Sequence, residues 1–422
     1  MKRVNLKGKN IAWWLTAVGL LAVSTSPSLT QGPEFKNFGL LALMCLSPLV
    51  LFIKGCRRWI PALDITVGVY TLLVLTMPLL FHPDSVRPAT LAVTAVSGMF
   101  YLALARTAAA SRMDVADFKG IIRVTVYLYM AVLLVQQACV LMGWPVFNAG
   151  SVYPGHPWKL NALMSEPSYT TFILSVLMYY HSLASSRGSD GDGILANFRK
   201  YPILWISYFW VISTTDNTSA LVFWPLPLLP LASRRSIAPA VGILATAAVV
   251  IAVMTPAVES RHVQRVFRLA EATVTADPDR IIEADESAAF RVVPSIYGAR
   301  EASVTSADDW TGHGVDADKR DLPPRPTLEE GFAGMFHVWH NYGIPAALAL
   351  WLLIAMVTLG PNPATWLMTL LLLFISGECN WQFFWCPVSA GILYKTVTKE
   401  GFNPLASLRK RGKIGRADTK KY

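Results

Sequence analysis

A short motif, Ser165-Glu166-Pro167-Ser168-Tyr169, places a carboxylate directly before a proline. At the mouth of a polar cavity, Glu166 could accept a proton from a hydroxyl group or orient that group for attack. The same pair is also an ordinary start for a helix, because proline fits the first turn and a carboxylate complements the positive end of the dipole. Both interpretations of Glu166, a general base and a helix start, remain open at this point.

Arginines gather about one hundred residues further on. Arg261, Arg265 and Arg268 recur at helical spacing, and at about 100° per residue their guanidinium groups lie within about 60° of one another. Three aligned guanidinium groups could clamp a pyrophosphate. The alternative is an interfacial helix with a solvated basic face. A further arginine, Arg291, follows the polar start of an expected short helix at Asp285-Glu286-Ser287.

Histidines lie in two places beyond these arginines. His313 stands in a glycine-flanked turn, Gly312-His313-Gly314, whereas His337 and His340 are three residues apart, so they would share one face of a helix. Such a pair could hold a metal ion, but no third ligand is evident, and the expected site therefore contains no metal. The remaining roles for these histidines are a base that titrates near neutral pH and an interfacial hydrogen-bonding group.

The elements that must position these residues are membrane helices. Of the 422 residues, 53% are hydrophobic and 15% are charged, and the mean hydropathy is +0.42, which excludes a soluble domain. The apolar runs are continuous rather than alternating, so they predict helices and not a transmembrane barrel. The expected spans are residues 11–29, 37–53, 60–82, 88–105, 120–144, 168–185, 201–215, 219–233, 238–258, 344–360, 363–378 and 384–396.

Basic residues predict which ends of these helices face the cytoplasm. Alternate connections and the C-terminal tail are rich in Lys and Arg, so the positive-inside rule places both termini in the cytoplasm with about twelve spans between them. The first apolar run lacks a convincing cleavage site and is interpreted as a retained helix. The net charge of +10 belongs to these cytoplasmic rims, where it would meet anionic lipid, so no nucleic-acid partner is expected.

Four regions follow from this pattern: a transmembrane bundle over 1–258, an outward loop over 259–343, further transmembrane spans over 344–396 and a basic cytoplasmic tail over 397–422. Between Glu259 and Glu330 the loop holds nine Arg or Lys against fifteen Asp or Glu, so its arginines would act as placed ligands within an acidic segment. The five cysteines indicate no disulfide framework, although a Cys379–Cys386 bridge is one alternative to two buried thiols.

The polar turn Thr214-Thr215-Asp216-Asn217-Thr218 separates two expected spans that are shorter than the bilayer is thick. A polar turn at such depth must face protein or water, because unsatisfied polar groups in lipid are costly. Asp216 is therefore expected at the floor of a funnel that opens outward. The alternative is that the helix ends lie elsewhere and that Asp216 is a solvated loop residue.

Three features together resemble the O-antigen polymerase and ligase superfamily of bacterial cell envelopes, integral-membrane glycosyltransferases of the GT-C type. They are the Ser165-Glu166-Pro167-Ser168 motif opening a mid-chain span, a single large outward loop between late spans, and Ser287 to Arg291 followed by the Gly312-His313-Gly314 turn. The segment Gly343-Ile344-Pro345-Ala346 is similar to the Gly-rich start of the helix that follows the loop in that family.

The resemblance implies an all-α, GT-C-like transmembrane bundle in the bacterial cytoplasmic membrane, with its active loop on the periplasmic side. The implied donor is an oligosaccharide on a polyprenyl pyrophosphate, and the implied acceptor is a sugar hydroxyl on another such lipid. Membrane lipids and a chain-length regulator are the other expected partners, and no cofactor is expected. Ligase-type transfer to a lipid or protein, and transport of the lipid-linked glycan, are the alternatives.

The chemistry of such a transfer assigns roles to the candidate residues. Displacing a pyrophosphate from an anomeric carbon needs cations for the leaving group and a base for the incoming hydroxyl, with no obligatory metal. Arg291, Arg261 and Arg265 are the leaving-group candidates, and Glu166 and then His340 are the base candidates. Arg268, Asp216, His313 and His337 complete the expected substrate-binding residues.

Overall fold

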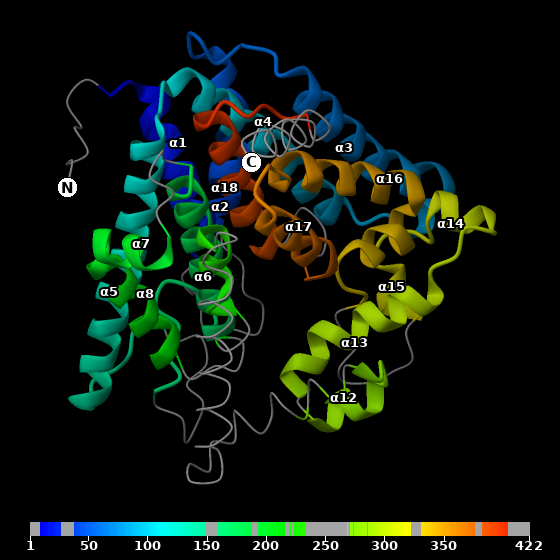
Figure 1. Cartoon of the computed structure of the whole chain (residues 1–422). Helices are drawn as coiled ribbons and strands as arrows, with labels where there is room; N and C mark the ends of the chain where they lie inside the picture. Colours follow the sequence, from blue (N-terminus) through cyan, green and yellow to red (C-terminus); the bar gives the residue numbers. More distant parts are fainter. Residues whose placement is uncertain are drawn as a thin grey trace, which may run out of the picture. The chain divides into compact units, whose positions relative to one another are not determined.

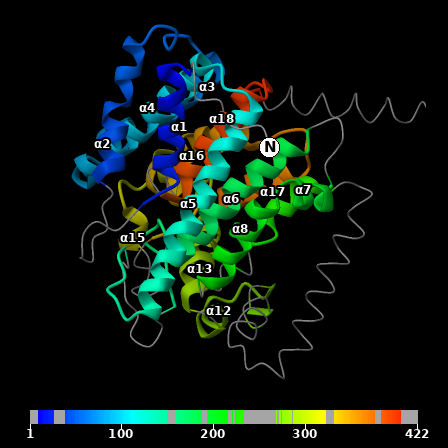
Figure 2. The ribbon, with the colours of Figure 1, turned by 90° about the vertical axis from the view of Figure 1, so that its left-hand side faces the viewer.

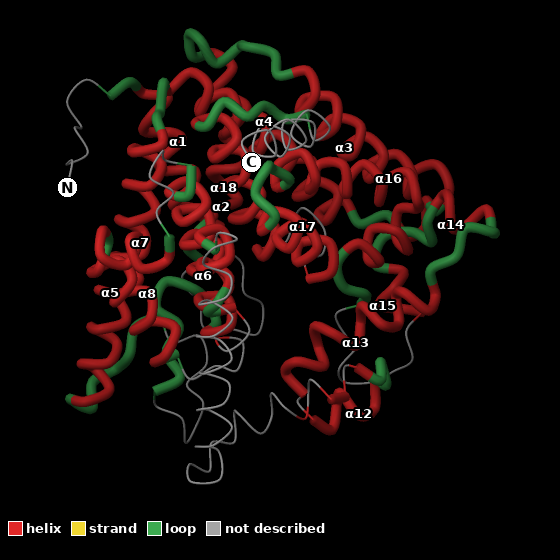
Figure 3. Tube along the Cα trace, viewed as in Figure 1, coloured by secondary structure: helices red, strands yellow, loops and turns green. Residues whose placement is uncertain are grey.

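In a computed structural model, the described part of the chain is built from helices and contains no strand (Figure 3). The structure describes residues 9–26, 38–148, 158–187, 193–215, 220, 223–232, 268, 271–272, 274–284, 286–321, 331–375 and 382–403. The chain forms two compact units. Unit 1 comprises Met1–Trp59, Ala103–Ala240 and Trp385–Gly401, and unit 2 comprises Ile60–Leu102, Val241–Phe384 and Phe402–Tyr422.

Each unit has its own set of helices, and two helices cross the boundary. Those of unit 1 are α1 (Ile11–Val23), α2 (Phe38–Leu46), η1 (Ser47–Phe52), α5 (Val115–Leu141), α6 (Pro167–Ser185), α7 (Ile194–Lys200), α8 (Pro202–Thr214) and η3 (Leu226–Leu231). Those of unit 2 are α3 (Pro61–Phe81), η2 (Pro83–Ser85), α12 (Pro278–Ala284), α13 (Glu286–Glu301), α14 (Ala307–Thr311), α15 (Ala317–Asp321), α16 (Met335–Thr358) and α17 (Ala364–Ile375). The crossing helices are α4 (Pro88–Ser111) and α18 (Gln382–Val397).

Four described helices are long and apolar enough to cross a membrane: α3, α4, α5 and α16. Large apolar side chains are exposed along α3 and α5, among them Leu72, Leu80, Val124 and Val135. Helices with such surfaces are stable in hydrocarbon, where every backbone group must be satisfied within the helix. The helical membrane protein expected from composition is confirmed.

The expected count of twelve spans is not reproduced in the described residues. Helix α1 ends at Val23, well before residue 29, and α2 passes into the 3₁₀ helix η1 next to Pro48. The expected span 219–233 is not confirmed as an α-helix in its described part, because residues 226–231 form the short 3₁₀ helix η3. Proline supplies no backbone N–H and clashes with the preceding turn, and Pro225, Pro227 and Pro230 prevent an α-helix there. The expected span 238–258 lies outside the described residues.

In unit 1, α5, α6 and α8 pack on one another, as Figure 2 shows. Helix α6 is buried along almost its whole length, so it forms the centre of this unit. Its start agrees with the structural interpretation of the Glu-Pro pair: Pro167 occupies the first turn and Glu166 is the N-cap residue. The Glu166 side chain makes no capping hydrogen bond, and its Oε2 accepts one from Ser168 Oγ at 3.1 Å.

In unit 2, α3 and α16 pack side by side (Figure 1). They are antiparallel, because Thr66 near the start of α3 donates a hydrogen bond to Met356 near the end of α16. The opposite end of this pair therefore brings the α3–α4 connection close to the start of α16. Around that end, α12 and α13 form a small apolar core with the start of α16, whose buried members are Ala272, Ile281, Ala289, Val293, Phe332 and Phe336.

Candidate functional site

The candidate site is built around a kink in α16 at Gly343, which has φ 83° and ψ 169° inside an otherwise helical segment. Pro345 follows and has no N–H, so the carbonyl of Asn341 loses its usual donor four residues ahead. The loop supplies replacements: Gly314 N–H donates to the Asn341 carbonyl at 3.1 Å, and His313 N–H donates to the His340 carbonyl at 2.8 Å. The glycine-flanked turn noted in the sequence is thus docked on the kink.

Two glycines make this docking sterically feasible. A Cβ on Gly343 would lie 2.2 Å from the carbonyl oxygen of Trp310, and a Cβ on Gly312 would lie 2.4 Å from the carbonyl oxygen of Asn341. Both glycines also have positive φ, a conformation that disfavours other residues. The two backbones therefore approach each other at a distance that excludes any side chain.

The connection between α3 and α4 holds the docked turn from a third direction. His82 Nε2 donates to the Gly312 carbonyl at 2.6 Å, and the Ser85 hydroxyl accepts a bond from Val315 N–H at 3.2 Å. Arg87 pairs with Asp316 at 2.7 Å.

His337 belongs to a buried polar network behind the turn. Its Nδ1 lies 2.5 Å from Asp318 Oδ2, and Asn341 Nδ2 donates to Asp318 Oδ1 at 3.0 Å. The backbone N–H of Phe332 donates to the same carboxylate at 2.6 Å. Burial by itself raises the pKa of Asp318, but His337 and these hydrogen bonds outweigh it and lower the pKa, so the carboxylate is ionised at neutral pH.

His313 and His340 form a stacked pair, with ring centroids 4.2 Å apart and an interplanar angle of 10°. Nδ1 of His313 lies 3.0 Å from the His340 carbonyl oxygen, which can only accept, so this nitrogen carries the proton. In the neutral ring, Nε2 of His313 then keeps its lone pair, as a general base requires. Although His337 and His340 are three residues apart, their rings have different neighbours, Asp318 and His313.

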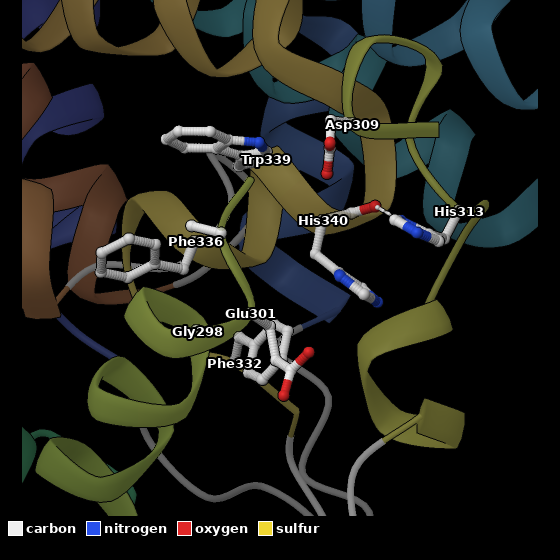
Figure 4. Close-up of a pocket in the computed structure, with 9 residues that line it drawn as sticks. Gly298, Glu301, Asp309, His313, Phe332, Phe336, Trp339 and His340 are labelled. Atoms are coloured by element: carbon white, nitrogen blue, oxygen red, sulfur yellow. Dashed lines mark hydrogen bonds between the residues drawn. The ribbon is translucent and has the colours of Figure 1, made fainter. Parts of the chain in front are cut away.

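A pocket adjoins the stacked histidines (Figure 4). It is a small, partly open pocket with about 240 Å³ of space when open solvent is counted, and it is lined by Gly298, Glu301, Ala302, Asp309, His313, Phe332, Phe336, Trp339 and His340. In the view of Figure 4 the rings of Trp339 and Phe336 lie on one side and the polar groups of Asp309, His340 and Glu301 on the other. The pocket therefore combines aromatic walls with two carboxylates and two imidazoles.

The Asp309 carboxylate of this pocket is held in place by hydrogen bonds. Asp309 is buried at the start of α14, where it forms a capping box with Ser306. Desolvation raises its pKa, but the hydrogen bonds from Ser306 and Ser303 and the proximity of His313 together lower it. Among the described residues, the buried Nε1 of Trp339 has no hydrogen-bond acceptor. A hydroxyl-bearing ligand in the pocket could donate to the two carboxylates.

The other predicted site residues are Glu166, Arg268, Arg291 and three residues outside the described part of the chain. Glu166 belongs to unit 1, whereas the pocket belongs to unit 2. Arg268 is an exposed helical residue, and Arg291 lies on α13 with a side chain outside the description. Arg261, Arg265 and Asp216 lie outside the described residues.

Sequence reasoning missed several residues that the structure brings together. Asp318 anchors His337, and Asp309, Glu301, Phe332 and Trp339 line the pocket beside His313. For Asp309 a signal existed in the sequence, because Ser306-Ala307-Asp308-Asp309 has the spacing of a capping box. No pattern pointed to Asp318, because its partner lies nineteen residues away on another helix.

The described residues contain no group of three or more His, Cys, Asp or Glu side chains that could hold a metal ion. Cys386 is a buried free thiol with Sγ 3.5 Å from Ser24 Oγ, and Cys379 lies outside the description. No protein-family model matches the chain, and no curated protein matches it significantly.

Proposed function

We propose that this chain is a membrane glycosyltransferase of the bacterial cytoplasmic membrane that polymerises oligosaccharide repeats carried on polyprenyl pyrophosphate. The observation that carries the proposal is the pocket at the start of α16, in which His313 and His340 stand beside Asp309, Glu301 and aromatic walls. Aromatic rings pack well on the C–H faces of sugars, and carboxylates accept bonds from their hydroxyl groups.

The proposed reaction is a displacement at the anomeric carbon of the donor sugar. The bond from that carbon to the pyrophosphate oxygen breaks, and a new bond forms to the acceptor hydroxyl oxygen. The acceptor proton passes to a base, for which the Nε2 lone pair of His313 is suited because the His340 carbonyl fixes its tautomer. The pyrophosphate leaves with the bonding electron pair, and Arg291 on α13 remains the candidate cation to stabilise it.

A membrane-length helix next to the pocket supports a lipid-linked substrate. Helix α16 begins at the pocket and continues as one of the four helices that could cross a membrane. A polyprenyl chain could lie in the bilayer against such helices while its sugars stay in water. The outward orientation, the polyprenyl donor and a chain-length regulator as partner belong to this proposal.

The test replaces His313 by asparagine, whose amide can still donate from the Nδ1 position but offers no base at the Nε2 position. We expect His313→Asn to lose about 10²–10⁴-fold of the transfer rate, the usual contribution of a positioned base. The measurement is chain extension of a purified lipid-linked repeat by the full-length protein in detergent, read as a ladder of product lengths.

Two matched carboxylates provide the control. Glu301 lines the pocket and Glu283 lies on α12 away from it, and both are exposed. Glu301→Gln should slow extension, whereas Glu283→Gln should not. Wild-type extension by both His313→Asn and Glu301→Gln would refute the proposed site, and attachment of single repeats without a ladder would indicate ligase-type transfer instead.

A further inference from the structure

One face of α5 shows how unit 1 meets a bilayer. Its residues Val124, Leu128, Val135 and Met142 are between 41% and 54% exposed, and at about 100° per residue they lie within about 40° of one another. Val124 and Met142 are eighteen residues apart, about 27 Å along the helix, which nearly matches a hydrocarbon core of about 30 Å. Exposed Trp144 follows, as expected at a membrane surface. Met142 therefore marks one edge of the hydrocarbon.

The connection between α5 and α6 returns below this edge. Gln136 lies six residues before Met142, so its Cα is about 9 Å inside the edge. Its Oε1 accepts a hydrogen bond from Ala162 N–H at 2.9 Å, and its Nε2 donates to the Phe147 carbonyl at 3.0 Å. Ala162 is fully buried, as irregular backbone at such depth must be unless it faces water. The connection therefore lies below the membrane surface at both Phe147 and Ala162.

The start of α6 lies at a similar depth by a second, independent comparison. Lys119 Nζ on α5 lies 3.5 Å from Ser185 Oγ, so the end of α6 is level with the first turns of α5 and the two helices are antiparallel. From Ser185 back to Glu166 the rise is about 28 Å, whereas from Lys119 to Met142 it is about 34 Å. Glu166 therefore lies about 6 Å inside the edge. Because side chains lean toward the start of their helix, the reach of Lys119 makes this depth a lower bound.

Glu166 is exposed in spite of this depth. Its neighbours at the start of α6, Pro167 and Ser168, are buried, and its Oε2 accepts a hydrogen bond from Ser168 Oγ at 3.1 Å. A carboxylate offers about four acceptor positions, so one such bond leaves most of its capacity unused. Ionisable side chains at membrane depth face protein or water, because contact with hydrocarbon is costly. An exposed carboxylate at this level is therefore expected to meet water.

We propose that Glu166 lines a water-filled recess of unit 1 that opens on the side of the membrane away from Lys119. The recess reaches below the headgroups to the start of α6, and the buried backbone around Ala162 forms part of its wall. It admits water and small hydroxyl-bearing solutes, whose O–H groups the Glu166 carboxylate accepts. Basic residues at the other end of α5 and α6 place the opening outside the cytoplasm. The recess is independent of the proposed transfer reaction.

The experiment compares single cysteines in intact cells that carry the full-length protein with its five native cysteines replaced. The probe is 2-sulfonatoethyl methanethiosulfonate, a small charged reagent that stays out of hydrocarbon and attacks thiolates. We expect Glu166→Cys to react at least about tenfold faster than Val135→Cys, because only the thiol in water ionises and meets the reagent. Val135→Cys is the matched control, since Val135 is also exposed and lies beside Gln136 on the lipid-facing stripe. Trp144→Cys reports the rate at the membrane surface.

Three outcomes would overturn the proposal. If Glu166→Cys reacts as slowly as Val135→Cys, the residue does not face water. If Val135→Cys reacts as fast as Trp144→Cys, the level of Gln136 is not inside the hydrocarbon. If Glu166→Cys reacts only after the membrane is permeabilised, the recess opens to the opposite side. Labelling of all variants after denaturation verifies their thiols, and Ser165→Cys, which changes a single atom, provides the same comparison should Glu166→Cys fail to insert.

Discussion

Three histidines of unit 2 show how one residue type serves different purposes within a few ångströms. His337 is buried and bound to an ionised Asp318, so its imidazole is part of the framework behind the site. His313 and His340 instead line the pocket, and the His340 carbonyl fixes the tautomer of His313. The pocket histidines, not the buried one, are therefore the candidates for proton transfer.

We expect Asp318→Asn to destabilise the protein by about 1–3 kcal/mol, the usual cost of leaving a buried hydrogen-bonding group without a partner. The carboxylate accepts bonds at both oxygens, from Asn341 on one and from His337 and Phe332 on the other, so an amide would point its NH₂ group at a donor in either orientation. Unfolding in detergent measures this effect. The control is Asp308→Asn. Asp308 is an exposed residue of α14, so this change should alter the free energy of unfolding by no more than about 0.5 kcal/mol.

The difference in stability between the wild type and Asp318→Asn should depend on pH. The pKa of Asp318 is lowered on folding, so its stabilisation is fully present above the ordinary aspartate pKa of about 3.9 and is lost as the pH falls through the lower folded value. The difference between wild type and Asp318→Asn should therefore shrink below about pH 3.9. A constant difference down to strongly acidic pH would contradict an ionised Asp318.

At the scale of elements, the site depends on a break in α16 and on the loop that completes it. Pro345 lacks an N–H donor and Gly343 leaves the helical conformation, so the carbonyls of His340 and Asn341 lose their partners within the helix. The N–H groups of His313 and Gly314 bind these two carbonyls instead. A buried carbonyl without a partner costs about 1–3 kcal/mol, so the docked turn and the kink stabilise each other. The pocket exists only where both are in place.

Gly343→Ala should cost more than the strain of its positive φ, because the new Cβ would lie 2.2 Å from the Trp310 carbonyl oxygen. Gly143→Ala is the reference for a positive φ alone, since Gly143 has φ 66° and no atom within 4 Å of its Cβ position, whereas the ψ of 169° at Gly343 adds strain of its own. We expect about 1–2 kcal/mol for Gly143→Ala, from conformation alone, and clearly more for Gly343→Ala. Equal losses in thermal unfolding would show that the close approach of the two backbones is unimportant.

At the scale of the whole molecule, the antiparallel pair α3 and α16 predicts the membrane topology of the site. Helix α3 has 21 residues, about 32 Å, and so is long enough to join opposite sides of a bilayer. Its far end continues into the connection that holds Gly312 and pairs Arg87 with Asp316. We therefore predict that this connection and the pocket lie on one side of the membrane and the start of α3 on the other.

Cysteine labelling tests this arrangement in a background in which the five native cysteines are replaced. A membrane-impermeant maleimide should label Arg87→Cys and Ser303→Cys from the same side in intact cells, and it should label Arg57→Cys only after the membrane is permeabilised. Arg57 lies before α3, Arg87 lies after α3, and Ser303 lies in the loop before α14. Labelling of Arg57→Cys and Arg87→Cys from the same side would exclude α3 as a span.

Local residue pattern determined much of this protein by itself. Continuous apolar runs specified helices in a membrane, and Pro61 and Pro167 start α3 and α6 where proline suits a first turn. Local pattern also identified the turn at His313 and the segment around Gly343, because both contain glycines, which adopt backbone conformations that other residues avoid. It failed at residues 226–231, where apolar composition suggested a span but closely spaced prolines prevent an α-helix.

Only the tertiary structure decided which of those residues meet. The spacing of His337 and His340 predicted one shared face, yet their neighbours, Asp318 and His313, come from segments far along the chain. Such contacts depend on the kink at Gly343 and on the packing of α3 against α16. The local residue pattern predicts neither of them. Helix formation is governed by neighbours within one or two turns, whereas a site is governed by the backbones that pack around it.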